Sequence, residues 1–166
     1  MKATDVNPEL IMMIGAPGTG KSTWRKDFMS KDSRDWVIVS SDDEIEAMLK
    51  PGETYSSNFQ QYIKPASQKA ESKFDQAIKK GANVILDRTN MSRKARRSWL
   101  QKLPKHYTRT AVVFSMDRDE LQRSLDARAE KTGKTIPSDV VDNMLRSYEE
   151  PDHVEFDRVE KIHRKL

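Results

Sequence analysis

The segment from Gly15 to Thr23 constrains the fold of this chain more than any other part of the sequence. It reads Gly-Ala-Pro-Gly-Thr-Gly-Lys-Ser-Thr and matches the pattern G-x-x-x-x-G-K-[ST]. Three of the six glycines of the chain lie in this short stretch. Glycine lets a backbone curl so that successive N–H groups point toward one anion. The pattern therefore predicts a phosphate-binding loop, called the phosphate loop below, between a strand and a helix.

The residues on both sides of the phosphate loop fit this prediction. Residues 10–14 form a continuous apolar run typical of a buried parallel strand, and residues 24–30 have the pattern of an amphipathic helix. Lys21 is expected to reach the β- and γ-phosphates of a nucleoside triphosphate, and the Ser22 hydroxyl is expected to bind Mg²⁺. The predicted nucleotide-binding residues of the loop are Gly15, Ala16, Pro17, Gly18, Thr19, Gly20, Lys21, Ser22 and Thr23.

Length and composition indicate one domain over residues 1–166. A content of 36% hydrophobic and 34% charged residues is typical of a highly charged soluble globule. No apolar run approaches the roughly 18 residues of a membrane span, and the N-terminus lacks the apolar region of a signal peptide. The absence of cysteine excludes disulfides and thiolate metal sites. Together with the need for a nucleotide, this predicts a cytoplasmic protein with no membrane partner, and the net charge of +4 does not by itself indicate nucleic acid.

Strand and helix patterns alternate along the chain, which predicts an α/β fold of three layers with a parallel sheet between helices. Strands are expected at residues 10–14, 36–40, 83–87 and 110–116, with a short last strand near 157–163. Helices are expected at about 21–30, from Asp42 or Asp43 to 50, at 58–80, 92–103, from Asp117 or Asp119 to 131, and 138–150. Ser92 and Ser138 are the predicted N-caps of two of these helices.

Acidic residues follow three of the predicted strands at the sheet edge where ligands bind in such folds. Asp42 and Asp43 come after the second strand, Asp87 ends the third, and Asp117 follows the fourth. Asp42 is well placed to take the proton of a phosphate acceptor, with helix capping as the alternative interpretation. Asp87 is predicted to hold Mg²⁺, with a turn or cap role as the alternative.

Basic residues follow the third strand and also surround a glycine-containing loop. Arg93, Arg96 and Arg97 share one side of a predicted helix and are expected to contact substrate phosphate, although a charge run on a helix is more often a solvated face. Residues 128–137, the lid segment, carry cations that would cover a triphosphate and exclude water. Its nucleotide-binding candidates are Arg128 and Lys131, with Lys134 beside them. Three aromatic residues beyond the second strand either stack on bases or pack in the core, and packing is favoured. They are Tyr55, Phe59 and Tyr62.

Four segments occur in the order found in the phage-type polynucleotide 5′-kinase domain, which the chain resembles over nearly its whole length. They are residues 15–24, 40–43, 87–90 with Arg96 and Arg97 beyond, and 128–137. The resemblance implies an adenylate-kinase-like fold that transfers the γ-phosphate of ATP, with Mg²⁺, to a 5′-hydroxyl of DNA or RNA. By motif position, Asp42 resembles the general base, Lys21 and Ser22 the phosphate and magnesium residues, and Arg128 a lid arginine. The residues expected to bind the acceptor are Asp43, Arg88, Thr89, Asn90, Arg93, Arg96 and Arg97.

The chain also departs from that family. Ile45 stands where the phage enzyme has an arginine that grips the substrate phosphate, and the second lid arginine appears as Lys131 or Thr132. Asp87 lies two residues before Thr89, as in the animal enzyme. Because no Asp-x-Asp-x-Thr signature of the companion 3′-phosphatase is present, we expect a stand-alone kinase. Two other functions remain open, a small-molecule kinase and a nucleotide-dependent RNA-binding module, and both a monomer and a homo-oligomer are compatible with the sequence.

Overall fold

A five-stranded parallel sheet forms the centre of the protein. The computed structural model describes residues 7–165, and the strand order is β2-β3-β1-β4-β5 with every neighbouring pair parallel. The strands are β1 (Glu9–Ile14), β2 (Trp36–Val39), β3 (Asn83–Asp87), β4 (Thr108–Met116) and β5 (Arg158–Arg164). The predicted α/β fold with a parallel sheet flanked by helices is confirmed, and so is the short last strand.

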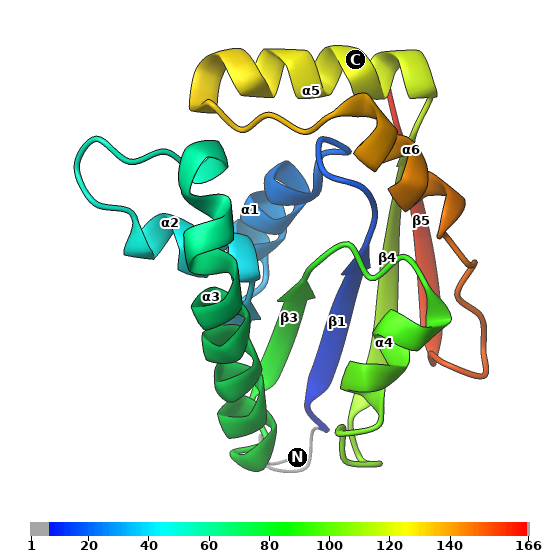
Figure 1. Cartoon of the computed structure of the whole chain (residues 1–166). Helices are drawn as coiled ribbons and strands as arrows, with labels where there is room; N and C mark the ends of the chain where they lie inside the picture. The colour runs from blue at the N-terminus through cyan, green and yellow to red at the C-terminus, as the bar shows by residue number, and fades with distance from the viewer. Residues whose placement is uncertain (1–6, 166) are drawn as a thin grey trace.

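Helices cover both faces of the sheet and one of its ends. They are α1 (Lys21–Lys31), α2 (Ser41–Met48), α3 (Tyr55–Lys79), α4 (Arg93–Leu100), α5 (Arg118–Thr132) and α6 (Ser138–Arg146). Figure 1 shows α3 and α4 in front of the sheet, α1 behind it, and α5 across the ends toward which the strands point. None of the helices in the described part of the chain is long and apolar enough to cross a membrane.

Alternate residues of β1 supply the two cores. Leu10 and Met12 pack into the cluster that contains Phe74 of α3, whereas Ile11 and Met13 pack into the cluster that Trp24 of α1 joins. Successive strand residues point to opposite faces, so a strand buried on both faces must be apolar throughout. The continuous apolar run read from the sequence is therefore the consequence of the three-layer arrangement.

Two helix starts differ from those expected, and the first matters for the site. Helix α2 is capped by Ser40, whose hydroxyl accepts a hydrogen bond from the Asp43 N–H at 3.2 Å, and not by Asp42 or Asp43. The serine comes first after the extended residues of β2, so it takes the cap and neither carboxylate is used for capping. Helix α3 begins at Tyr55 because Thr54 caps it, where the start had been expected at residue 58.

The remaining helix starts agree closely with the sequence. Ser92 caps α4 through the Ala95 N–H at 3.1 Å, as predicted. Asp117 holds the N-cap position of α5. Helix α6 has Pro137 at that position, one residue before the expected Ser138, because the fixed φ of proline suits a helix entrance.

Candidate active site

A cavity of about 960 Å³ lies at the carboxyl ends of the strands. The phosphate loop, α2 and the start of α3 line one side of it, and residues of α5, α6 and the lid segment line the other. The connection from β1 runs past β3 to β2, whereas the connection from β3 runs back past β1 to β4. Such a reversal of strand order is where open α/β sheets bind their ligands. The fold thus brings the predicted loop and the predicted acidic residues to one cavity.

The phosphate loop has a backbone that only glycine adopts easily. Gly18 and Gly20 have φ values of 84° and 90°, and Gly20 is the N-cap of α1. The Gly15 N–H donates to the Thr89 carbonyl oxygen at 3.0 Å, which ties the loop to the end of β3. The Thr19 hydroxyl is buried and donates to the Ala16 carbonyl oxygen at 2.7 Å. The loop therefore forms a rigid cradle at the start of α1.

Lys21 is held under this cradle. Its Nζ donates to the Gly15 carbonyl oxygen at 2.9 Å and lies 3.4 Å from the Arg88 carbonyl oxygen. Burial lowers the pKa of the Lys21 ammonium, while the nearby Asp87 and Asp42 carboxylates act in the opposite direction. The two oxygens that contact the Lys21 ammonium belong to neutral backbone carbonyls. A triphosphate would give this ammonium negatively charged oxygens as partners.

One buried hydroxyl at the cavity is unpaired. The Ser41 side chain lines the cavity and is 6% exposed, yet its Oγ has no hydrogen-bond partner among the described residues. Buried hydroxyls are nearly always paired, so Ser41 keeps a hydrogen-bonding group to spare at this edge of the cavity. With the glycine cradle and Lys21, the residues present fit a nucleoside triphosphate.

Arg25 joins two of the acidic residues at this edge. It lies one turn after Lys21 on α1 and pairs with Asp87 at 2.8 Å and with Asp43 at 3.0 Å. Burial raises the pKa of the Asp87 carboxyl, and Lys21 and Arg25 oppose that shift. Among the described residues, no group of three or more His, Cys, Asp or Glu side chains could hold a metal ion. Ser22 and Asp87 both line the cavity and are the residues that would hold an ion shared with phosphate and water, the coordination usual for Mg²⁺.

The predicted acceptor side contains an aromatic wall. The Tyr55 hydroxyl donates to Asp42 Oδ1 at 2.5 Å, and the Tyr55 and Phe59 rings lie 5.6 Å apart. Both rings line the cavity together with Ile63. Tyr62 is not among the lining residues, and its hydroxyl donates to Glu53 at 2.6 Å instead. Two of the three aromatic residues are therefore available to a ligand, although core packing had been favoured for them.

The residues after β3 divide between the cavity and the fold. Arg88 and Thr89 line the cavity, and burial lowers the pKa of the Arg88 guanidinium, whose centre lies 5.6 Å from the Trp99 ring. Asn90 is buried and its amide donates to the Met13 carbonyl oxygen at 2.8 Å. Its φ of 49° makes it the one described non-glycine residue with positive φ. Asn90 therefore shapes the turn after β3.

The arginines of α4 require a correction. Arg96 is 0% exposed and holds Glu155 through two hydrogen bonds of 2.9 and 3.1 Å. Its guanidinium also donates to three backbone carbonyl oxygens, those of Asn90, Met91 and Glu149. Arg93 pairs with Asp152 at 2.6 Å.

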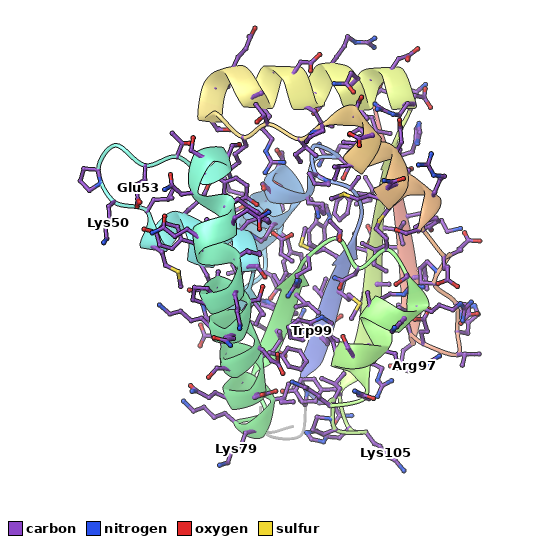
Figure 2. The ribbon with its side chains drawn as sticks, viewed as in Figure 1. Lys50, Glu53, Lys79, Arg97, Trp99 and Lys105 are labelled. Carbon is purple, nitrogen blue, oxygen red and sulfur yellow. The ribbon has the colours of Figure 1, made fainter. Side chains whose placement is uncertain are left out.

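Neither residue is among the cavity-lining residues that the structure describes, and neither is Arg97. Figure 2 shows Arg97 at the outer side of α4, away from the end of the sheet covered by α5. The expectation that these three arginines face an acceptor is therefore replaced by a structural role for Arg93 and Arg96. Arg96 became buried because it shares the inward face of α4 with Trp99 and Leu100.

The lid segment lies against the start of α3. Arg128 and Lys134 line the cavity, whereas Lys131 is exposed on α5 and is not among the described lining residues. Lys134 pairs with Glu46 and lies 4.8 Å from the centre of the Tyr55 ring. The Thr135 N–H donates to Ser56 Oγ at 2.7 Å.

Two of the cavity residues that sequence reasoning did not single out are Arg25 and Arg164. Arg25 follows Lys21 of the phosphate loop by one helical turn, which was an available signal. Arg164 is the last residue of β5, and a Cβ added to Gly20 would lie 2.6 Å from its Cδ, so its side chain packs on the phosphate loop. No local motif marked Arg164, because only the strand order brings β5 to this edge.

A model of the AAA_33 family, described as an AAA domain, matches residues 10–151. The chain belongs to the AAA_33 family. This is a family of P-loop kinases, in agreement with the phosphate loop and the fold. The heterogeneous nuclear ribonucleoprotein U-like protein 2 of Mus musculus is 25% identical over 154 residues, which cover 89% of this chain and 20% of the relative. The AAA_33 chain thus spans about a fifth of the length of the curated relatives it matches.

Solved structures give the same fold. A chain of the Pnkp1/Rnl/Hen1 RNA repair complex is 27% identical with a TM-score of 0.70, over 85% of this AAA_33 chain and 44% of that chain. A putative kinase from Chloroflexus aurantiacus has a TM-score of 0.71 at 17% identity, over 95% of this chain and 85% of that chain. The second likeness bears on the fold alone.

Proposed function

We propose that the chain is a polynucleotide kinase that transfers the γ-phosphoryl group of ATP to the 5′-hydroxyl end of DNA or RNA. The observation that carries the proposal is the convergence of Asp42 and Lys21 on one cavity. Phosphoryl transfer needs a positioned phosphate, neutralised charge and a group that takes the acceptor proton, and this cavity offers residues for each need. The 27% identity to a chain of an RNA repair complex supports a nucleic acid acceptor.

Each residue has a separate task in this proposal. The N–H groups of the phosphate loop and the Lys21 ammonium bind the β- and γ-phosphates, and Ser22 and Asp87 hold the Mg²⁺ ion. Mg²⁺–ATP supplies the phosphoryl group. Arg128 approaches from the lid and stabilises negative charge that develops during transfer. The Asp42 carboxylate takes the proton of the acceptor hydroxyl as the hydroxyl oxygen attacks the γ-phosphorus, the bond from that phosphorus to the β–γ bridging oxygen breaks, and ADP leaves.

The aromatic wall supports a nucleoside at the acceptor end. Tyr55, Phe59 and Ile63 offer flat and apolar surface on which a base stacks, whereas a sugar acceptor needs mainly hydrogen-bonding groups. Arg88 lines the same cavity, and no carboxylate pairs with its guanidinium among the described residues. It is the candidate for the phosphate that follows the terminal nucleoside, in place of the family arginine whose position Ile45 occupies. Ile45 is fully buried and unable to reach a substrate.

A small-molecule kinase is the second candidate, and one observation favours it. Arg93 and Arg96 are engaged with Asp152 and Glu155, so they do not extend a basic surface away from the cavity. Beyond Arg88, these two arginines therefore offer no charge to the phosphates of a longer polynucleotide. An acceptor as small as a nucleoside would fill the aromatic wall equally well.

The experiment that separates these functions is a comparison of acceptors. The protein is incubated with γ-labelled ATP, Mg²⁺ and 5′-hydroxyl oligonucleotides of DNA or RNA, with 5′-phosphorylated oligonucleotides as the matched control. Label on the 5′-hydroxyl oligonucleotides alone is the expected result. Label only on members of a panel of nucleosides and sugars would establish the second candidate. Nucleotide binding with no labelled acceptor would establish a binding module without transfer activity.

A further inference from the structure

Tyr55 lies between the proposed general base and the lid segment. It is the first residue of α3, and its hydroxyl donates to Asp42 Oδ1 at 2.5 Å. Burial and this hydrogen bond raise the pKa of the phenol far above its usual value, so the hydroxyl keeps its proton over the whole working range. A hydrogen bond to a carboxylate is about twice as strong as one between neutral groups. Tyr55 therefore fixes the direction in which Asp42 points.

The ring of the same tyrosine contacts the lid segment. Lys134 Nζ lies 4.8 Å from the ring centre, and the Lys134 side chain is only 12% exposed because it also pairs with Glu46. The Thr135 N–H donates to the hydroxyl of Ser56, the next residue along α3, at 2.7 Å. The lid segment is thus docked on α2 and α3 directly beside Asp42, and Tyr55 is the residue that touches both.

We propose that Tyr55 is a positioning residue that couples docking of the lid segment to the orientation of Asp42, an inference that rests on the proposed function. When the lid segment is docked, Lys134 fixes the ring and the hydroxyl holds Oδ1. Oδ2 is then the oxygen left for the proton of the acceptor hydroxyl. When the lid segment undocks, the ring gains freedom at the first turn of α3 and Asp42 loses its orientation. The base is then set for transfer only while the lid covers the nucleotide, which limits loss of the phosphoryl group to water.

The test uses Tyr55→Phe, which removes the hydroxyl but keeps the ring under Lys134. Tyr62→Phe is the matched control, because Tyr62 lies on the same helix and also donates to a carboxylate, that of Glu53, away from the cavity. Tyr55→Phe should lower kcat about 10- to 100-fold, the value of a hydrogen bond to a charged group, with little change in KM for ATP. Tyr62→Phe should keep the wild-type kcat.

The split between kcat and KM distinguishes positioning from a general loss of structure. Tyr55→Phe removes the hydrogen bond that holds Asp42 but keeps the ring that lines the cavity, so only the transfer step should slow. The KM for ATP and the melting temperature should stay close to those of the wild type. A fall in kcat accompanied by an equal loss of nucleotide binding or of stability would overturn the positioning role.

Coupling to the lid segment is tested with Lys134→Ala alone and combined with Tyr55→Phe. Lys134→Ala should speed hydrogen exchange at the Thr135 amide, whereas Tyr55→Phe should leave that amide protected. Lys134→Ala should lower kcat, and its effect should shrink when the Tyr55 hydroxyl is already absent. Independent, multiplicative effects of the two substitutions would overturn the coupling.

Failure of the inference differs from failure of the proposed function. The kcat ratios are measured with whichever acceptor the wild-type protein phosphorylates. A wild-type protein that uses only small acceptors refutes the polynucleotide proposal, and the ratios then still decide the role of Tyr55. A wild-type protein that phosphorylates no hydroxyl refutes both. Equal kcat values for Tyr55→Phe and the wild type refute the inference alone.

Discussion

Replacing Arg96 with methionine tests whether the α4 arginines serve the fold or a substrate. Methionine preserves much of the length and apolar stem of the side chain but removes the guanidinium. It leaves the Glu155 carboxylate, which is 11% exposed, without its partner. It also removes the guanidinium donor from the carbonyl oxygens of Asn90 and Glu149, whereas the Met91 carbonyl oxygen keeps the Glu149 N–H.

The expected loss of stability follows from these orphaned groups. Removing one partner of a buried ion pair costs about 3–5 kcal/mol, because the remaining charge stays buried and uncompensated. For a chain of 166 residues, a loss of that size lowers the melting temperature by about 10 °C. Urea unfolding and thermal unfolding followed by circular dichroism measure both quantities. Arg97→Met is the matched control, because Arg97 is exposed on the same helix and should change stability by less than about 0.5 kcal/mol.

A different result would refute this reasoning. If Arg96→Met unfolds like the wild-type protein but no longer uses its acceptor, Arg96 acts on a substrate and the buried network does not hold the fold together. If Arg97→Met proves the more destabilising substitution, the assignment of the inward face of α4 is wrong.

Three further results are expected. Gly20→Ala forces alanine to a φ of 90° and should cost about 1–2 kcal/mol of stability while weakening nucleotide binding, measured by calorimetry. Gly52→Ala imposes similar strain at a φ of 85° with open space around it, so equal weakening of nucleotide binding there would contradict the cradle. Phe74→Ala empties a fully buried position against Trp99 and should cost about 3–5 kcal/mol in urea unfolding, and a loss below about 1 kcal/mol would contradict the packing. Chelation of Mg²⁺ should abolish transfer without lowering the melting temperature of the nucleotide-free protein, because no cluster of metal-ligating side chains occurs in residues 7–165. A lowered melting temperature would indicate a structural metal.

The sheet and the phosphate loop could be predicted because their determinants are local. The apolar run of β1 favours a strand and the glycines after it favour a turn, and neither preference depends on residues distant in the sequence. The end of β3 followed from Asp87 at the end of another apolar run. Ser40 shows the limit of this reasoning, because several residues able to cap a helix stand in a row and the geometry of β2 decides among them.

The acceptor side could be predicted only in part because its determinants are distant in sequence. A helical projection would have placed Arg96 on the face of Trp99 and Leu100, but its carboxylate partner, Glu155, lies 59 residues further along the chain. The same holds for the contact of Lys134 with Tyr55 and for Arg164 above Gly20. The sequence identifies the basic residues, but only the tertiary structure shows which of them are already paired with carboxylates or backbone carbonyls.

In the proposed reaction, Asp42 activates a 5′-hydroxyl for attack on a phosphoryl group held by the phosphate loop. The decisive experiment is transfer from γ-labelled ATP to a 5′-hydroxyl oligonucleotide by the wild-type protein and by Asp42→Asn, with nucleotide affinity measured on both. We expect label on the oligonucleotide with the wild-type protein, at least about a 100-fold loss with Asp42→Asn, and nearly equal nucleotide affinity. Transfer by Asp42→Asn at the wild-type rate, or no label on any 5′-hydroxyl oligonucleotide with the wild-type protein, would contradict it.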